Sequence, residues 1–386
     1  MALYLLYLLL LQPPAPELPR VKPVGKLQVV ATFGGPMPTG VAVSKAGRVF
    51  VNYPRWGDDV TFTVAEVKAG VATAYPDAAF SVYDKAKPAE TLVSVQSVVV
   101  DAADRLWMLD TGTVEFGPVI PGGAKLVGVD LASNTVVKSI PVPADVALPT
   151  TYLNDVRFDL TRGKAGTAYV TDSSTEGPNA VVVIDLDSGK CRRRLHDHPS
   201  TKADKGFLPF VEGKPLLTRK QKDGPRQSMS FGADGVAISA DGKFLYYCPL
   251  SSRRLHRVPT ESLAGDAPDA EVGKAVEDLG VRPFASDGLE SDAQGRLYLT
   301  DYEHNAIVRR DPDGTYTTIA HDPRMLWPDT MALAADGYLY FTANQLNRQK
   351  QFHNFHDERE KPYVLFRVKV DGTPVGSPAA PPGGAK

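Results

Sequence analysis

A strand–turn–strand pattern recurs six times along this chain, and this repeat constrains the fold more than any other feature of the sequence. In each copy a short apolar run ends at a turn, and a second apolar run follows at once. The copies begin at Gly40, Ser97, Asn154, Asp234, Asp287 and Asp329. Apolar runs separated by such turns are typical of antiparallel hairpins, so each copy predicts two paired strands.

Most copies are followed by one or two further strands, such as KLVGVDL and TVVKSIPV after the second copy. Six units of four strands predict an all-β fold, a six-bladed β-propeller. The sixth unit has only one further strand, from Pro362 to Val370. We therefore expect the segment from Lys26 to Phe33 to complete the last blade and close the ring. The alternative, a pair of β-sandwiches, does not explain the missing strand.

The predicted propeller covers residues 26–370 and has a short segment at each end. The apolar run from Ala2 to Leu11 is too short to span a bilayer as a helix, so we expect no stable membrane span. The run has the length of a signal-peptide core, and residues 1–25 are interpreted as a signal peptide or a disordered leader. The protein is then secreted or periplasmic. Residues 371–386 are interpreted as a flexible tail.

Composition excludes several classes of function. The net charge is −2 and no basic stripe is present, which gives no support for nucleic-acid binding. The two cysteines, Cys191 and Cys248, form no CxxC pair, and this excludes a zinc knuckle. They are either one disulfide or two unpaired thiols. The sequence contains no hydrolase nucleophile elbow and no zincin, Walker or dinucleotide-binding motif, so we expect no organic cofactor. We also expect a monomer.

Polar residues gather at one predicted mouth of the channel, here called the top, where the innermost strands start. These starts carry Asn154, Asp155, Asp234, Asp287 and Asp329, and the ends of the second strands add Asn52, Asp110, Asp172, Asp301 and Asn344. Carboxylates so close together repel one another unless a cation or a cationic ligand lies among them. Aspartate before glycine is also common in turns, where the side chain only stabilises the turn. This turn alternative stays open for each single residue.

Several segments resemble the yellow/major royal jelly protein family. They are GPMPTGVAVSKAGRVFVNYPRWGDDVTFTVAEV, WPDTMALAADGYLYFTANQLNR, YLNDVRFDL and KPYVLFRV. The resemblance implies an exported six-bladed propeller, and a chain without a multi-disulfide pattern is similar to a bacterial-type member. Insect members include dopachrome-converting enzymes and binders of biogenic amines. In the amine binders the ligand lies near residues that correspond here to Thr330 and Asn344.

The chain also resembles, more distantly, the senescence-marker/gluconolactonase family of metal-dependent propellers. That resemblance places Asp287 and Asp234 at two ligands of a divalent cation, calcium or zinc, and Asn154 at a substrate contact. The position of the family's glutamate ligand falls near Thr39, which cannot replace a carboxylate. We therefore expect weak metal binding or none, at Asp234 and Asp287.

Three functional hypotheses follow. The first is binding of a small amine or aromatic compound, with Tyr53, Trp56 or Trp327 stacking on the ligand. The second is an enzyme, either a metal-dependent lactonase or an isomerase that uses Asp287 or Asp329 as its base. The third is a scaffold whose top face binds another protein. For the small-molecule hypothesis, we expect one cavity to be lined by Asp287, Asp329, Thr330 and Asn344, with Asn154, Asp155 and Asp234 as further ligand contacts.

Overall fold

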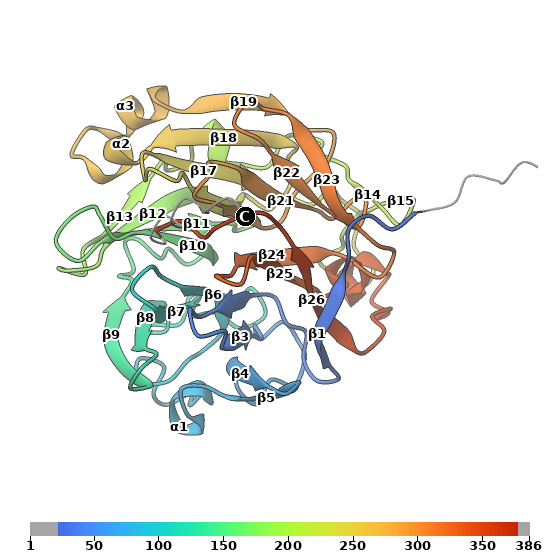
Figure 1. The fold of residues 1–386 in the computed structure, drawn as a ribbon, viewed down its shortest axis with the longest axis horizontal. Coiled ribbons are helices and arrows are strands. Elements are labelled where there is room, and N and C mark those ends of the chain that lie inside the picture. The colour runs from blue at the N-terminus through green and yellow to red at the C-terminus, as the bar shows by residue number, and fades with distance from the viewer. Residues whose placement is uncertain (1–21, 377–386) are drawn as a thin grey trace, which may run out of the picture.

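The computed structural model describes residues 22–376, which form six four-stranded antiparallel sheets around a central channel (Figure 1). The prediction of a six-bladed β-propeller is confirmed. The inner strands are β2 (Val41–Val43), β6 (Val95–Val100), β10 (Leu153–Asp159), β16 (Ala233–Ile238), β20 (Leu289–Ser291) and β24 (Pro328–Leu333). The second strands are β3 (Val49–Asn52), β7 (Arg105–Asp110), β11 (Thr167–Asp172), β17 (Phe244–Pro249), β21 (Leu297–Asp301) and β25 (Tyr338–Ala343).

The outer half of each blade comprises two more strands. The third strands are β4 (Val64–Lys68), β8 (Lys125–Asp130), β12 (Ala180–Asp185), β18 (Arg254–Pro259), β22 (Ala306–Arg310) and β26 (Tyr363–Lys369). The outermost strands are β5 (Val71–Ala74), β9 (Thr135–Pro141), β13 (Cys191–Arg194), β19 (Glu277–Val281), β23 (Tyr316–His321) and β1 (Gln28–Phe33). The loops hold a hairpin and short helices: β14 (Phe210–Val211), β15 (Lys214–Pro215), α1 (Ala78–Ser81), α2 (Thr260–Ala264), α3 (Asp269–Lys274), η1 (Pro199–Thr201), η2 (Leu346–Arg348) and η3 (Lys350–Phe352).

The ring closes as the sequence predicts. Strand β1 pairs antiparallel with β26, so the last blade has the order β1-β26-β25-β24 (Figure 1). Phe33 lies opposite Tyr363 and Gln28 lies opposite Arg367, across one irregularity in the register. Because β1 covers the edge of β26, the first and last parts of the chain share one sheet, and that edge is not free to pair with another molecule.

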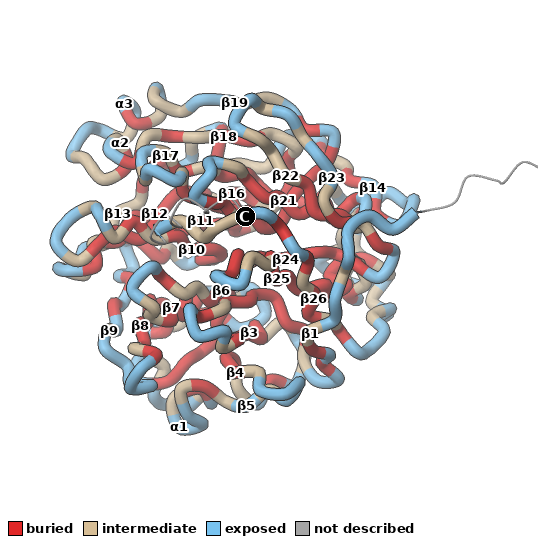
Figure 2. The backbone as a smooth tube through the Cα atoms, in the orientation of Figure 1, coloured by how far each residue is buried: buried red, intermediate tan, exposed pale blue. Residues whose placement is uncertain are grey.

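The hydrophobic core lies between the blades. Figure 2 shows buried residues along the inner and middle strands, whereas exposed residues follow the outermost strands. Strand β11 is buried at every position, and β5 alternates between exposed and half-buried positions. Continuous apolar runs in the inner strands follow from packing on both faces, since each blade is covered by a neighbour on either side.

Two Asp–Gly pairs lie where neighbouring inner strands approach closely. A Cβ atom on Gly235 would collide with the carbonyl oxygen of Asp287, and one on Gly288 would collide with that of Asp329. Asp234 and Gly235 both lie within β16. Here glycine is required by close backbone contact between blades, so the turn alternative does not account for Asp234.

The two ends of the chain lie partly outside the described residues. The predicted leader is described only from residue 22, and the predicted tail only to residue 376. Residues 371–376 leave β26 and lie against the β20–β21 turn, where the Ala293 amide donates to the Thr373 carbonyl at 2.8 Å. Within residues 22–376, no helix is long and apolar enough to cross a membrane. Cys191 and Cys248 lie in different blades and are not bonded to each other.

Candidate ligand site at the top of the channel

β-Bulges at the starts of the inner strands position the polar side chains. The register of β10 with β11 shifts between Leu153 and Val156, and that of β16 with β17 shifts between Ala233 and Val236. The start of β24 has the same irregularity between Pro328 and Met331. A bulge interrupts the alternation of a strand and redirects its side chains. Each of these bulges contains one or two of the predicted polar residues: Asn154 and Asp155, Asp234, and Asp329 and Thr330.

Four of the predicted residues line one small cavity. Asn154, Asp234, Asp287 and Asp329, which come from four consecutive blades, surround a space of about 30 Å³. A water molecule needs roughly 10–15 Å³ of such space, so the cavity holds one or two waters but no organic ligand. The structure therefore brings the predicted carboxylates together in a narrow site.

Neutral groups donate the hydrogen bonds that these carboxylates accept. Asn154 Nδ2 donates to Asp234 Oδ1 at 2.7 Å, and Trp327 Nε1 donates to Asp287 Oδ2 at 2.7 Å. Asp329 Oδ2 accepts from Asn344 Nδ2 at 2.6 Å. Within residues 22–376, none of the three carboxylates forms an ion pair with a lysine or arginine.

Burial raises the pKa of all three carboxyl groups. For Asp234 and Asp329 the negative charges of neighbouring aspartates raise the pKa further, and both values lie well above the usual range. The pKa of Asp287 rises to about 7, because burial outweighs the hydrogen bond from Trp327. The cluster therefore retains protons near neutral pH, which a cation could replace.

Asp155 lies in the channel but does not line this cavity. It is buried, its Oδ1 atom has no hydrogen-bond partner in the described structure, and burial raises its pKa against the opposing charge of Arg157. Thr330 and Asn344 do not line the cavity either. Both donate to Asp329, Thr330 Oγ1 at 3.1 Å and Asn344 Nδ2 at 2.6 Å, so they fix the carboxylate in place.

An aromatic lid covers the cavity. It consists of Trp56, Phe116, Tyr152 and Phe231, which all line the space. The ring of Phe116 stacks on Trp56 at 5.1 Å and contacts Tyr152 at 4.7 Å. Trp56 Nε1 donates to the Tyr152 hydroxyl at 2.8 Å. Phe116 is 43% exposed, so an apolar ring faces solvent directly above a buried acidic cluster.

Only one of the three aromatic residues proposed from the sequence belongs to this lid. Trp327 is fully buried and stacks on Tyr302 at 4.1 Å, so it packs between strands rather than facing the cavity. Tyr53 lies at a separate pocket beside Phe33. Phe116 and Phe231 were missed by sequence reasoning, because they lie in long loops and outside any repeated motif.

The polar residues at the ends of the second strands have a different role. Asp110 accepts from the amides of Val93 and Ser94 and forms a 2.9 Å ion pair with Lys125. Asp172 accepts from the Tyr152 amide and pairs with Arg193 at 2.9 Å. These carboxylates hold the loops of the top face, as the turn alternative predicts.

The residues do not fit the metal site of the distant resemblance. Thr39 is fully buried, accepts a hydrogen bond from Asn52 at 2.8 Å and donates to the Gln96 carbonyl, so it is not free to act as a ligand. Within residues 22–376, no group of three or more His, Cys, Asp or Glu side chains is arranged to hold a metal ion. Weak metal binding at Asp234 and Asp287 stays a prediction, to be tested by metal analysis after dialysis.

Comparison with known proteins identifies the family. Residues 93–376 match the sequence profile of the family described as Major royal jelly protein. The chain belongs to the major royal jelly protein family. It is 26% identical over 226 residues to Major royal jelly protein 1 of Apis mellifera, a match that covers 55% of this chain and 48% of that protein. The match to Protein yellow of Drosophila pseudoobscura pseudoobscura, also 26% identical, covers 59% of this chain and 40% of that protein.

Solved structures show the same fold in other families. A gluconolactonase from Xanthomonas campestris superimposes with a TM-score of 0.53 over 93% of this chain and 99% of that one, at 14% identity. This likeness concerns the fold alone. The chain spans about half the length of the curated royal jelly relatives that it matches, so their activities are not transferred to it.

Proposed function

We propose that this royal-jelly-type propeller binds a small aromatic cation at the top of its channel. The observation that carries the proposal is the group of three buried carboxylates, Asp234, Asp287 and Asp329, which no cationic side chain of residues 22–376 neutralises. An ammonium group placed among them would remove the desolvation penalty that raises their pKa values. The aromatic lid supplies faces on which an aromatic or cationic group can stack.

Binding requires the aromatic lid to move, because pockets for small molecules usually enclose about 300–1,000 Å³. The narrow cavity has only about 30 Å³. In the lid loop, Glu115 and Phe116 are consecutive residues with positive φ angles of 51° and 57°. Such backbone conformations are unfavourable for residues other than glycine. We expect the loop to release this strain when Phe116 swings outward and a ligand enters.

The test compares tyramine, a cation, with catechol, a neutral compound of similar size, by titration calorimetry. Asp329→Asn should weaken tyramine by about 2–5 kcal/mol, since one charged partner of a desolvated ligand is lost. The matched control is Asp59→Asn, an exposed aspartate of the same top face, which should leave tyramine binding unchanged. Asp172 is unsuitable as a control because its ion pair with Arg193 is buried. Equal binding of tyramine to all three proteins, or tighter binding of catechol, would contradict the proposal.

A second candidate function, a proton-transfer isomerase for catechol-derived compounds, is favoured by Asp287. Its pKa of about 7 suits a group that accepts and returns a proton at neutral pH. Trp327 holds one carboxylate oxygen, which leaves the other for the cavity. Asp287→Asn should then abolish conversion of a catechol-derived substrate, whereas tyramine should still bind, more weakly, through Asp234 and Asp329. Turnover that survives in Asp287→Asn would leave the site as a binding site only.

Export and the monomeric state stay predictions. The apolar run from Ala2 to Leu11 lies outside the described residues. Cell fractionation, with mass analysis of the mature N-terminus, tests export. Size-exclusion chromatography with light scattering tests the monomer.

A further inference from the structure

A second pocket lies at the opposite mouth of the channel. It encloses about 310 Å³ and is lined by the residues that end the inner strands of blades two to six, among them Val99, Arg157, Ile238, Glu290 and Leu333. The top cavity is lined by residues that begin those strands, so the two spaces lie at opposite ends of one channel. At this size, the lower pocket can hold a small organic molecule.

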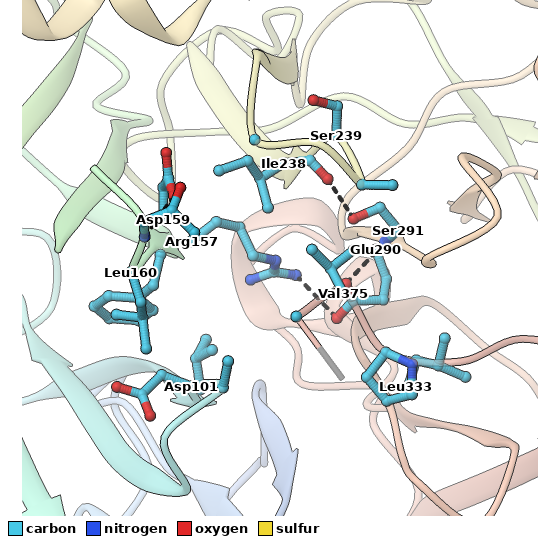
Figure 3. A pocket seen from close by; sticks show the side chains of 18 of the residues that line it. Asp101, Arg157, Asp159, Leu160, Ile238, Ser239, Glu290, Ser291, Leu333 and Val375 are labelled. Carbon is cyan, nitrogen blue, oxygen red and sulfur yellow. Dashed lines mark hydrogen bonds and ion pairs between the residues drawn. The ribbon is translucent and has the colours of Figure 1, made fainter. Parts of the chain in front are cut away.

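Arg157 is the most unusual group in this pocket. Its side chain extends into the middle of the space, toward Glu290 (Figure 3). It is only 5% exposed, and its guanidinium donates to the carbonyls of Val156 at 2.9 Å and Leu289 at 2.5 Å. The Nε atom has no hydrogen-bond partner in the described structure. A guanidinium has five N–H donors, so most of its hydrogen-bonding capacity is not used.

No carboxylate of the described residues accepts a hydrogen bond from Arg157. Glu290 Oε2 lies 3.8 Å from the guanidinium, beyond hydrogen-bond distance, and Glu290 Oε1 accepts from the Ser291 amide. Asp101, Asp159 and Asp241 also line the pocket, and each accepts hydrogen bonds from its own turn. Burial raises the pKa of Glu290, and the charge of Arg157 opposes this rise. Among the described residues, Arg157 therefore has one long ion pair, with Glu290, and no anion that accepts a hydrogen bond from it.

The end of the described chain forms one wall of this pocket. Residues 371–376 cross from β26 to the β20–β21 turn, where the Thr373 amide donates to Gln294 Oε1 at 3.2 Å. Val375 then lies beside Arg157 and Glu290 (Figure 3). Together with Val99, Ile238 and Leu333, it gives the pocket apolar walls around a single cationic group.

We infer that this lower pocket binds a small carboxylate with an apolar body. The carboxylate accepts hydrogen bonds from the unused donors of Arg157, since guanidinium and carboxylate groups match in geometry and charge. The apolar body lies against Val375 and Leu333. This site is independent of the proposed amine site, because it lies at the other mouth and selects the opposite charge.

The experiment uses the full chain and benzoate as the probe, with benzamide as the neutral match of the same size. Titration calorimetry should show saturable benzoate binding that is stronger than benzamide binding. Arg157→Met should weaken benzoate by about tenfold or more, because the partner charge is lost. Arg257→Met is the matched control, since Arg257 lies on β18, is partly exposed and pairs with Glu277, and neither residue lines the pocket. It should leave benzoate binding unchanged.

A second variant decides the question if Arg157→Met fails to fold, since Arg157 also bonds two backbone carbonyls. Val375→Trp fills the pocket without touching those bonds and should reduce benzoate binding to a similar extent. Unchanged benzoate affinity in Val375→Trp would overturn the inference. Absence of saturable benzoate binding to the unmodified chain up to about 10 mM would overturn it as well.

Discussion

The top of the channel carries two sets of buried aspartates whose surroundings differ sharply. Asp234, Asp287 and Asp329 begin or precede inner strands and accept hydrogen bonds only from neutral groups. Asp110 and Asp172 end second strands, and each pairs with a cation at 2.9 Å. Residue type and burial are therefore the same in both sets, and the difference lies in the partners that the fold supplies.

This comparison separates structure from function in physical terms. A carboxylate that is matched by backbone amides and a buried cation stabilises the loops around it. A buried carboxylate without a cationic partner retains the free-energy cost of its desolvation. Such costs persist mainly at functional sites. Asp301 is intermediate, because burial raises its pKa while His304 Nδ1, at 2.9 Å, opposes the rise. The unmatched set is therefore the better candidate for a ligand site.

The largest expected effect comes from breaking a matched pair. Asp110→Asn leaves the Lys125 ammonium buried without its counter-ion, and both side chains are at most 2% exposed. Loss of one partner of such a pair typically destabilises a protein by about 3–5 kcal/mol. Urea denaturation should show this loss, whereas the exposed control Asp59→Asn should change stability by less than about 0.5 kcal/mol. A decrease in the free energy of unfolding below about 1 kcal/mol for Asp110→Asn would contradict the distinction between the two sets of aspartates.

The second prediction concerns pH. The folded pKa of Asp287, about 7, lies above its unfolded value of about 3.9. The folded state thus binds the proton more tightly, and the resulting stability is fully present below about pH 4 and is lost as the pH rises through 7. A rise in pKa from about 3.9 to about 7 corresponds to about 4 kcal/mol of stability. The urea midpoint should therefore fall between pH 5 and pH 8, and Asp287→Asn should flatten the fall.

Other groups also titrate in this range, so the decisive quantity is the difference between the unmodified chain and Asp287→Asn. Equal pH slopes in the two proteins would show that Asp287 titrates normally. The asparagine retains an oxygen that can accept from Trp327, and the variant therefore keeps the packing of the unmodified site.

The sequence predicts the fold well because the repeat is local. The two strands of each hairpin can be recognised within its own copy of the repeat. The incomplete sixth unit predicts the pairing of β1 with β26. The same repeat fixes which residues begin the inner strands, and this brought Asn154, Asp234, Asp287 and Asp329 to one cavity. These conclusions require only the order of strands in a blade.

The details of the site could not be predicted, because they depend on tertiary packing. A bulge at the start of β24 changes which side chains face the cavity, so Thr330 supports Asp329 instead of lining the space. Phe116 reaches the cavity from a long loop with no repeated pattern. Arg157 lies inside an ordinary strand motif, and only the structure shows that it faces a pocket and that its Nε atom has no hydrogen-bond partner among the described residues.

The smallest expected effect is the sharpest test of the comparison, because it uses the same chemical change as the first prediction. The pKa of Asp234 lies well above its usual range through burial and the charges of neighbouring aspartates. A raised pKa favours the neutral, protonated carboxyl group, which asparagine resembles in shape and charge. The Asn154 side chain, which donates to Asp234 Oδ1 at 2.7 Å, keeps an acceptor in the amide oxygen. Asp234→Asn should change the free energy of unfolding at pH 7 by less than about 1 kcal/mol, against about 3–5 kcal/mol for Asp110→Asn. If urea denaturation gives equal losses for the two variants, Asp234 is ionised and its charge is compensated by neighbouring groups, as that of Asp110 is. The acidic cluster would then have no uncompensated charge to attract a ligand.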